Sequence, residues 1–219
     1  MLRTNPSNQS PINVAVFLYD FKDRYISLVV QNFEEIQRNN PGKVQFTFYD
    51  GKNDQSVQNI DINAVLNKKR TRYSVLTINN AGIRTEELAL RVADWDRNTA
   101  RSMVEPLYLQ YGKDIEAIIS NNDEMAIGAI EALQKYGYNK GYSTKTIPVV
   151  GVDGIPEAQE LIKQGIMTGS VLQYAKAMAE VSYNIGMNLI DVRPPLYGIP
   201  YEFDGTGVAV RIPYKQISC

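Results

Sequence analysis

Apolar runs alternate with amphipathic stretches through the first third of the chain. Residues 13–19 form a β-branched apolar run, which predicts a buried strand. Residues 26–38 carry apolar side chains at three- and four-residue spacing, which predicts a helix. Residues 43–50 alternate as a second strand, and residues 53–69 and 73–78 predict a further helix and strand. Strands and helices that alternate with short connections indicate a parallel, doubly wound α/β sheet.

The same alternation continues to the end of the chain. The predicted strands cover residues 86–95, 115–120, 146–153 and 167–173, the predicted helices cover 96–110, 121–133, 155–164 and 174–190, and a last strand falls near 207–214. The alternation of predicted strands and helices therefore favours an α/β protein from one end of the sequence to the other.

Polar or aromatic side chains follow five of the predicted strands. In open parallel sheets, ligands bind beyond the carboxyl ends of the strands, where helix N-termini point. The residues at these ends are Asp20, Asp23 and Tyr25; Trp95 and Asp96; Asn121, Asn122 and Asp123; Asp153; and Gln173. Carboxylates and planar amides can bind adjacent hydroxyl groups in pairs, and an aromatic ring can pack on the C–H face of a sugar. This combination predicts a site for a neutral carbohydrate.

Each of these residues also has a simpler explanation. An Asp or Asn after a strand is often only the N-cap of the next helix, and a lone Trp is more often a core residue. The coincidence at five strand ends favours a binding site over these alternatives. Within it, we expect Asn122 to reach the ligand and Asp123 to cap the helix that follows.

The composition narrows the classes of function. The chain has no histidine, which excludes Ser-His-Asp and Cys-His catalysis, and its one cysteine is Cys219. A net charge of -1 provides no basic surface for nucleic acid or an anionic membrane. The first twelve residues are polar, so we expect that the chain is cytosolic or that its leader has been removed.

Four stretches closely resemble the periplasmic galactose/glucose-binding proteins of sugar ABC transporters, within a match that runs from about residue 13 to 190. They read "NDQSVQNIDINAVL", "IEAIISNNDEMAIGAIEAL", "IPVVGVDGIPEAQELIKQG" and "MTGSVLQYAKA". The resemblance implies two α/β lobes with parallel, doubly wound sheets that close on a pyranose through a hinge. It also implies a periplasmic or extracellular protein, either free or lipid-anchored, that delivers a monosaccharide to an ABC permease and, in some members, to a chemoreceptor.

The resemblance assigns roles to particular residues. It implies that the sugar is bound by Asp23 and Tyr25 of the first lobe and by Trp95, Asn122, Asp153 and Gln173. Tyr25 and Trp95 stack on opposite ring faces in this scheme. Gln173 stands where the family has Asn, which leaves its contact open because Gln is longer by one methylene. Glu116 matches an outlying ligand of the family's calcium loop, but one carboxylate does not form a calcium site, so no metal or cofactor is expected.

The sequence departs from the family after Asn79. There it passes directly to a stretch typical of the second lobe, so on the order of a hundred residues of the family pattern are missing. The implied arrangement is residues 1–79 in an incomplete first lobe, 80–173 in the second lobe, 174–192 as a helix returning to the first lobe, and 193–219 as the final crossing and last strand. A true deletion would favour domain swapping, dimerisation or loss of sugar affinity.

Four functions therefore remain open. The leading one is a sugar-binding protein without catalytic activity. The second is a sensory or regulatory module of the same fold, although residues 1–12 are too short for a helix-turn-helix. The third is an enzyme that uses Asp123 and Asp153 as an acid/base pair, and the fourth is a fragment that binds no ligand.

Overall fold

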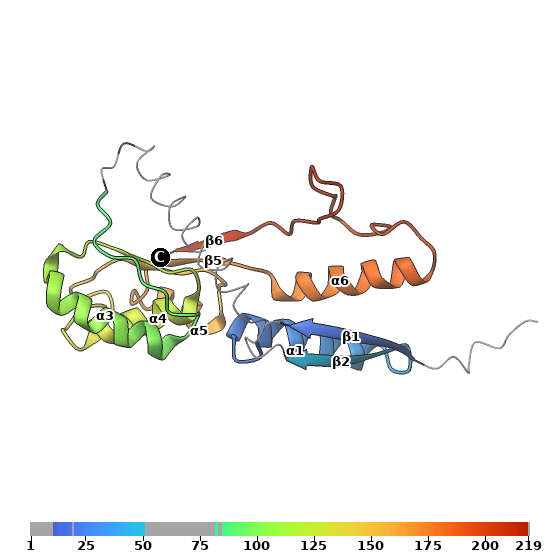
Figure 1. Ribbon diagram of the computed structural model, residues 1–219, viewed down its shortest axis with the longest axis horizontal. Helices are drawn as coiled ribbons and strands as arrows, with labels where there is room; N and C mark the ends of the chain where they lie inside the picture. The colour runs from blue at the N-terminus through green and yellow to red at the C-terminus, as the bar shows by residue number, and fades with distance from the viewer. Residues whose placement is uncertain (1–10, 19, 51–81, 83–84, 219) are drawn as a thin grey trace, which may run out of the picture. The chain divides into compact units, whose positions relative to one another are not determined.

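The computed structural model describes residues 11–18, 20–50, 82 and 85–218 (Figure 1). The chain divides into two compact units, and each is built from two separate stretches of sequence. Unit 1 contains Met1–Asp54 and Tyr174–Pro213, and unit 2 contains Gln55–Gln173 and Tyr214–Cys219. The helix predicted over residues 53–69 and the strand predicted over 73–78 lie outside the described residues, so the predicted division into lobes stays a prediction.

Unit 1 contains a two-stranded parallel sheet with helices beside it. Its elements are β1 (Ile12–Leu18), α1 (Arg24–Asn39), β2 (Val44–Asp50) and α6 (Ala175–Ile190). The strands pair in parallel, from Ile12 with Val44 to Leu18 with Asp50. Helix α1 makes the crossover between them and also packs along α6. All four of these elements were predicted, and each is thus confirmed in type and place.

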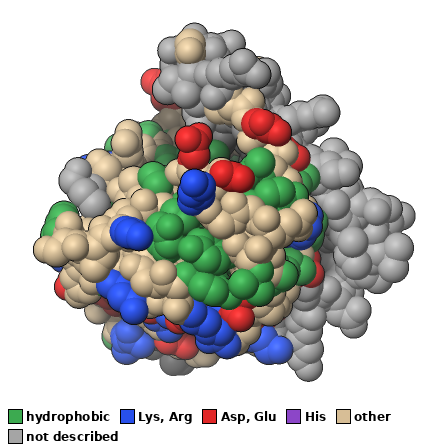
Figure 2. Space-filling model, turned by 90° about the vertical axis from the view of Figure 1, so that its left-hand side faces the viewer, with side chains coloured by type: hydrophobic (Ala, Val, Ile, Leu, Met, Phe, Trp, Pro, Cys, Tyr) green, Lys and Arg blue, Asp and Glu red, His purple; other side chains and the backbone are tan. Residues whose placement is uncertain are grey.

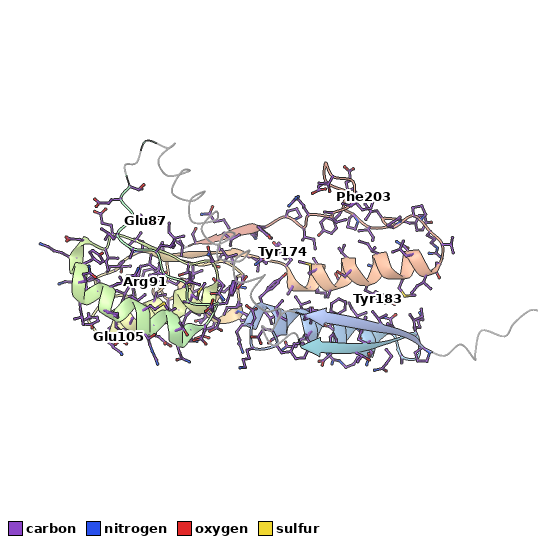
Figure 3. The ribbon with its side chains drawn as sticks, viewed as in Figure 1. Glu87, Arg91, Glu105, Tyr174, Tyr183 and Phe203 are labelled. Carbon is purple, nitrogen blue, oxygen red and sulfur yellow. The ribbon has the colours of Figure 1, made fainter. Side chains whose placement is uncertain are left out.

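The core of unit 1 follows from the alternate apolar positions of β2 and from the apolar positions of α1 at three- and four-residue spacing. In β2, Val44 and Phe46 are buried while Gln45 and Thr47 are exposed, as a strand with one covered face requires. Helix α1 buries Val29 and Phe33, and the rings of Phe33 and Phe46 lie 5.0 Å apart between centroids. Tyr183 extends from α6 and meets Phe46 edge-on at 6.3 Å (Figure 3). Ala175 and Ala179 of α6 complete this cluster.

Unit 2 is built on a four-stranded sheet. Its elements are α3 (Arg97–Tyr111), the 3₁₀ turn η2 (Gly112–Asp114), β3 (Ile118–Ile119), α4 (Asp123–Gln134), β4 (Val149–Val150), α5 (Pro156–Lys163), β5 (Gly169–Leu172) and β6 (Lys215–Ser218). The strand order is β3-β4-β5-β6. The first three strands are parallel, whereas β6 is antiparallel to β5, so the sheet is mixed.

Helix α4 is the most buried helix of unit 2. Ala126, Ile127, Ala129, Ile130 and Leu133 are all almost completely buried, together with Val149 of β4. A helix that is apolar on most sides in this way is a core helix with neighbours around it. Helix α3 packs along it, and Arg97 of α3 bonds carboxylates on both α4 and α5.

The strand predicted over residues 86–95 is wrong. The structure describes residues 85–93 as irregular backbone, with a turn at Asp94 and Trp95. A strand with one covered face would bury every second side chain, but residues 88–90 are all half-buried and residues 91 and 92 are both exposed. The apolar residues of this segment therefore pack irregularly rather than on one face of a sheet.

The last predicted strand is displaced. The expected range, 207–214, contains only one isolated bridge between Phe203 and Val210, and the strand β6 begins at Lys215. Gly207 has a φ of 73°, and Pro213 has no N–H to donate to a neighbouring strand. Both residues oppose a continuous strand over this range.

The surface carries charges of both signs. Figure 2 shows hydrophobic side chains gathered in the middle of one face, with Lys and Arg mostly on one side of them and Asp and Glu mostly on the other. Of the helices that the structure describes, none combines the length and apolar character that crossing a lipid bilayer requires.

Candidate functional site

Three of the predicted site residues lie beyond the ends of neighbouring strands in unit 2. Asn122 follows β3, Asp153 follows β4 and Gln173 follows β5. Backbone bonds continue past the ends of β4 and β5: the N–H of Asp153 donates to Val171 at 2.8 Å, and that of Gln173 donates to Asp153 at 2.9 Å. The sheet therefore brings these residues to one edge, as the strand order predicts.

The side chains of Asp153 and Gln173 contact each other directly. The Nε2 of Gln173 donates to Oδ1 of Asp153 at 2.6 Å. Asp153 is 8% exposed and has a φ of 121°, a backbone conformation that costs an L-residue energy. Its carboxylate is thus fixed by the backbone bridge to Leu172 and by the Gln173 amide.

Asn122 is the N-cap of α4, which corrects the assignment of this role to Asp123. The Oδ1 of Asn122 accepts from the N–H of Met125 at 2.9 Å, and its backbone is extended, as an N-cap requires. Asp123 is the first residue of the helix itself. An extended residue can point its side chain back at the first turn, and Asp123 already has helical backbone. Asn122 is 2% exposed.

Trp95 lies next to Asn122 in space. The Nδ2 of Asn122 donates to the backbone carbonyl of Trp95 at 3.2 Å. Trp95 is half-buried and has a φ of 58°, and Asp94 before it has a φ of 48°. Bulky residues rarely adopt this left-handed conformation, and strained backbone of this kind clusters at functional sites. Asp94, Trp95 and Asp153 are three of the five non-glycine residues with positive φ in the described part of the chain.

Asp123 is completely buried beneath this edge of the sheet. Its Oδ2 accepts from the N–H of Ile155 at 2.9 Å, and its Oδ1 accepts from the hydroxyl of Ser170 at 2.5 Å. Burial raises the pKa of the Asp123 carboxyl to about 6, against the lowering effect of these hydrogen bonds. The sequence pattern did not point to Ser170, which is a buried polar residue inside a strand.

The two candidates from unit 1 have local roles in the described structure. Asp23 caps α1, because its Oδ1 accepts from the N–H of Ile26 at 2.9 Å. Burial raises the pKa of the Asp23 carboxyl above its ordinary value. Tyr25 packs against the core of unit 1. Sugar contacts from Asp23 and Tyr25 stay predictions.

The acidic residues that the structure describes do not form a metal centre. Glu116 is exposed. Within the described residues, no group of three or more His, Cys, Asp or Glu side chains is arranged to hold an ion. The described residues instead offer amide, carboxylate and indole groups at the ends of β3, β4 and β5 and in the turn before α3. Such groups can bind a neutral ligand that carries hydroxyl groups.

Comparisons with known proteins agree with this chemistry. The chain is 33% identical to the D-galactose/methyl-galactoside binding periplasmic protein MglB of Haemophilus influenzae, over 82% of this chain and 49% of that protein. It is 40% identical to the D-allose-binding periplasmic protein of Escherichia coli over 39% of this chain and 26% of that protein. The chain thus spans about half the length of the Haemophilus protein, or less of the other.

A solved structure supports the fold. An ABC transporter solute binding protein from Bacillus halodurans, with bound myo-inositol, superposes with a TM-score of 0.65 at 19% identity and covers 97% of this chain and 96% of that chain. The predicted fold class, an α/β fold like that of periplasmic binding proteins, is confirmed by this likeness. Residues 74–193 match the family described as "Periplasmic binding protein domain". The chain belongs to the family of periplasmic binding proteins.

Proposed function

We propose that this protein binds a neutral monosaccharide, and that Trp95, Asn122, Asp153 and Gln173 of unit 2 contact it. The observation that carries the proposal is a pair of hydrogen bonds beyond the strand ends: Gln173 with Asp153 at 2.6 Å, and Asn122 with the Trp95 carbonyl at 3.2 Å. They hold a carboxylate, two amides and an indole in one unit. A carboxylate oxygen has two lone pairs, so the bond from Gln173 leaves Asp153 with further accepting capacity.

The names of the relatives support a sugar rather than another small molecule. Relatives are described as binding galactose or allose, and the superposed structure contains myo-inositol. These molecules all present several hydroxyl groups on a saturated ring. Within this class we propose glucose or galactose as the first ligands to test, as the family resemblance implies. The proposal includes transport rather than catalysis, with an ABC permease as the partner and the periplasm as the location.

The single tryptophan makes a direct test available. Because Trp95 is the only Trp in the chain, its fluorescence emission reports on the candidate site alone. Titration of the purified protein with glucose, galactose, allose and ribose should give a saturable change with at least one of them. Calorimetry should give the same dissociation constant. Glutamate, which is charged and lacks the hydroxyl pattern, should give no change.

Two variants test whether sugar binding depends on the candidate site or on any change in the protein. Trp95→Ala should abolish the heat of binding, because the apolar sugar face loses its partner. Leu109→Ala changes a side chain of α3 that is 73% exposed, and it should leave affinity unchanged. A protein that is folded by circular dichroism but shows no saturable response to any of the four sugars would overturn the proposal.

A further inference from the structure

We propose that Asp123 is a positioning residue whose ionised carboxylate holds the loop of residues 151–155, and with it Asp153, in the shape that binds sugar. Protonation of Asp123 then loosens this loop and lowers sugar affinity. The second statement rests on the proposed function; the first concerns the loop itself and can be tested without any ligand.

The geometry joins three elements at one carboxylate. Asp123 begins α4, its Oδ2 accepts from Ile155 at the end of the loop, and its Oδ1 accepts from Ser170 on β5. The start of the loop also packs against the Asp123 carboxylate, because a Cβ built on Gly151 would lie 2.4 Å from its Oδ1. The loop therefore wraps directly over this carboxylate, and only glycine fits at residue 151.

Asp153 lies in the middle of that loop and depends on its two ends. Its φ of 121° is unfavourable for an L-residue, and the neighbouring Gly154 has a φ of 67°. The N–H of Gly154 donates to the Ser170 hydroxyl at 3.3 Å, and that same hydroxyl donates to Asp123. Strained backbone persists only where its surroundings fix it, and here Asp123 and Ser170 are the fixing groups.

Protonation of Asp123 would change its carboxyl group from an acceptor to a donor in one hydrogen bond of this network. An ionised carboxylate accepts from both Ile155 and Ser170. A protonated one must donate from one oxygen, so either the Ser170 hydroxyl turns away or the bond to Ile155 is lost. Because burial raises the pKa of Asp123 to about 6, the change falls within a range that ordinary buffers cover.

Few charged groups surround Asp123. On its own helix the neighbouring Glu124 raises the pKa of Asp123 slightly by its negative charge. The loop contributes Asp153, and α5 contributes Glu157. From α3, Arg97 lies 3.8 Å from Glu124 and 2.9 Å from Glu157, which offsets the negative charge of both. Residues 169–172 of β5 contain no titratable side chain.

The sign of the effect on binding follows from linkage. If the ionised form holds the loop in its binding shape, sugar binding favours ionisation and lowers the pKa of Asp123. Affinity is then highest above a pH of about 6 and decreases as the pH falls through that value. A charge-assisted hydrogen bond that is lost on protonation corresponds to roughly a tenfold change in affinity.

The first experiment needs no sugar. The amide proton shifts of Gly154 and Ile155 are followed by NMR from pH 4.5 to pH 8. Both should titrate with a midpoint near the pKa of about 6 in the wild type and should stay flat in Asp123→Asn, which mimics the protonated form. Asp114→Asn, which removes an exposed carboxylate in η2, serves as the matched control and should titrate like the wild type.

The second experiment measures affinity by calorimetry over the same pH range with the sugar that binds best. The wild type and Asp114→Asn should lose roughly tenfold in affinity below pH 6. Asp123→Asn should bind at every pH as weakly as the wild type does at pH 5. Flat amide shifts in the wild type, or equal pH profiles for wild type and Asp123→Asn, would overturn the inference and leave the proposed function intact. Absence of binding at all pH values, with titrating amides, would overturn the proposed function and retain the role of Asp123 in the loop.

Discussion

The carbonyl oxygen of Arg97 in α3 lies against the Cα of Gly128 in α4, so closely that a Cβ on Gly128 would be 2.1 Å from it. This is far below any contact that a methyl group makes with a backbone oxygen. Helices α3 and α4 therefore pack at a distance that only glycine permits. Because Trp95 lies just before α3 and Asn122 is the N-cap of α4, this contact also sets the spacing of the candidate site.

Replacement of Gly128 should be severely destabilising. In Gly128→Ala the new methyl group must displace the backbone of α3, and we expect the free energy of unfolding to decrease by at least about 2 kcal/mol. Gly186→Ala is the matched control, since Gly186 also lies inside a helix but has nothing within 4 Å of a built Cβ. That variant should be neutral or more stable by about 0.5–1 kcal/mol. Urea denaturation of both variants checks this, and equal effects would contradict it.

Arg97 should contribute more to the free energy of unfolding than its neighbour Arg101. Its side chain is 29% exposed, and its guanidinium lies 2.6 Å from Glu131, 2.9 Å from Glu157 and 3.8 Å from Glu124. Arg97→Ala leaves three carboxylates close together without their shared cation. We expect a loss of about 1–3 kcal/mol in the free energy of unfolding, measured in urea at low salt.

The control for this network is Arg101→Ala. Among the described residues, the acidic partner of Arg101 is Glu131, at 3.5 Å, and the Arg101 side chain is 42% exposed. Partly exposed pairs of this kind contribute about 0–1 kcal/mol. Arg97→Lys should recover only part of the loss, because one ammonium cannot bond two carboxylates as a planar guanidinium does. A smaller loss in Arg97→Ala than in Arg101→Ala would contradict the importance of the network.

The stability of the protein should carry a pH dependence that originates at Asp123. Its pKa is raised to about 6 in the folded protein, against about 4 in the unfolded chain. Between these values the folded protein binds a proton that the unfolded chain does not, so this group lowers the free energy of unfolding as the pH rises through the window. The full effect is on the order of 2–3 kcal/mol.

Asp123→Asn should remove that dependence. The difference in the free energy of unfolding between the variant and the wild type should shift in favour of the variant from pH 4 to pH 7, when measured by urea denaturation. The comparison uses the difference because other carboxylates also titrate in this range. A difference that is constant with pH would show that Asp123 does not ionise where burial places its pKa.

Gln173 should contribute to sugar affinity through Asp153. In Gln173→Ala the Asp153 carboxylate loses the amide that orients it at 2.6 Å, and we expect roughly a tenfold loss of monosaccharide affinity by calorimetry. Gln173→Asn is one methylene shorter and should show a similar loss. Gln164→Ala removes an exposed amide that bonds Glu160 and should bind as the wild type does. Unchanged affinity in both Gln173 variants would exclude this contact from the site.

The sequence predicted helices better than strands, and the reason is physical. The helices around residues 26–38, 96–110, 155–164 and 174–190 carry caps or stop signals of their own, and each lies within two residues of its expected ends. Strands require partners. Residues 86–95 are rich in apolar side chains but do not bury alternate ones, and β6 depends on pairing with β5, which no local pattern reveals.

The positions of the candidate residues at strand ends could be predicted from the sequence, but their hydrogen bonds could not. The parallel order of β3, β4 and β5 explains why Asn122, Asp153 and Gln173 lie at one edge. That Asn122 rather than Asp123 caps α4 could not be read from the sequence, because both residue types cap helices well. The partnership of Asp123 with Ser170 spans 47 positions and depends on the assembled sheet.

The core of unit 1 has a consequence for the order in which the newly made chain can fold. Val29, Phe33 and Phe46 are covered in part by Ala175 and Ala179, which follow only after the intervening sequence of unit 2. At translation rates of about 5–20 residues per second, α6 emerges from the ribosome on the order of ten seconds after β2. During that interval these three apolar side chains lack the helix that covers them. The N-terminal part of the nascent polypeptide is therefore prone to aggregate, and a chaperone that shields it would reduce this risk.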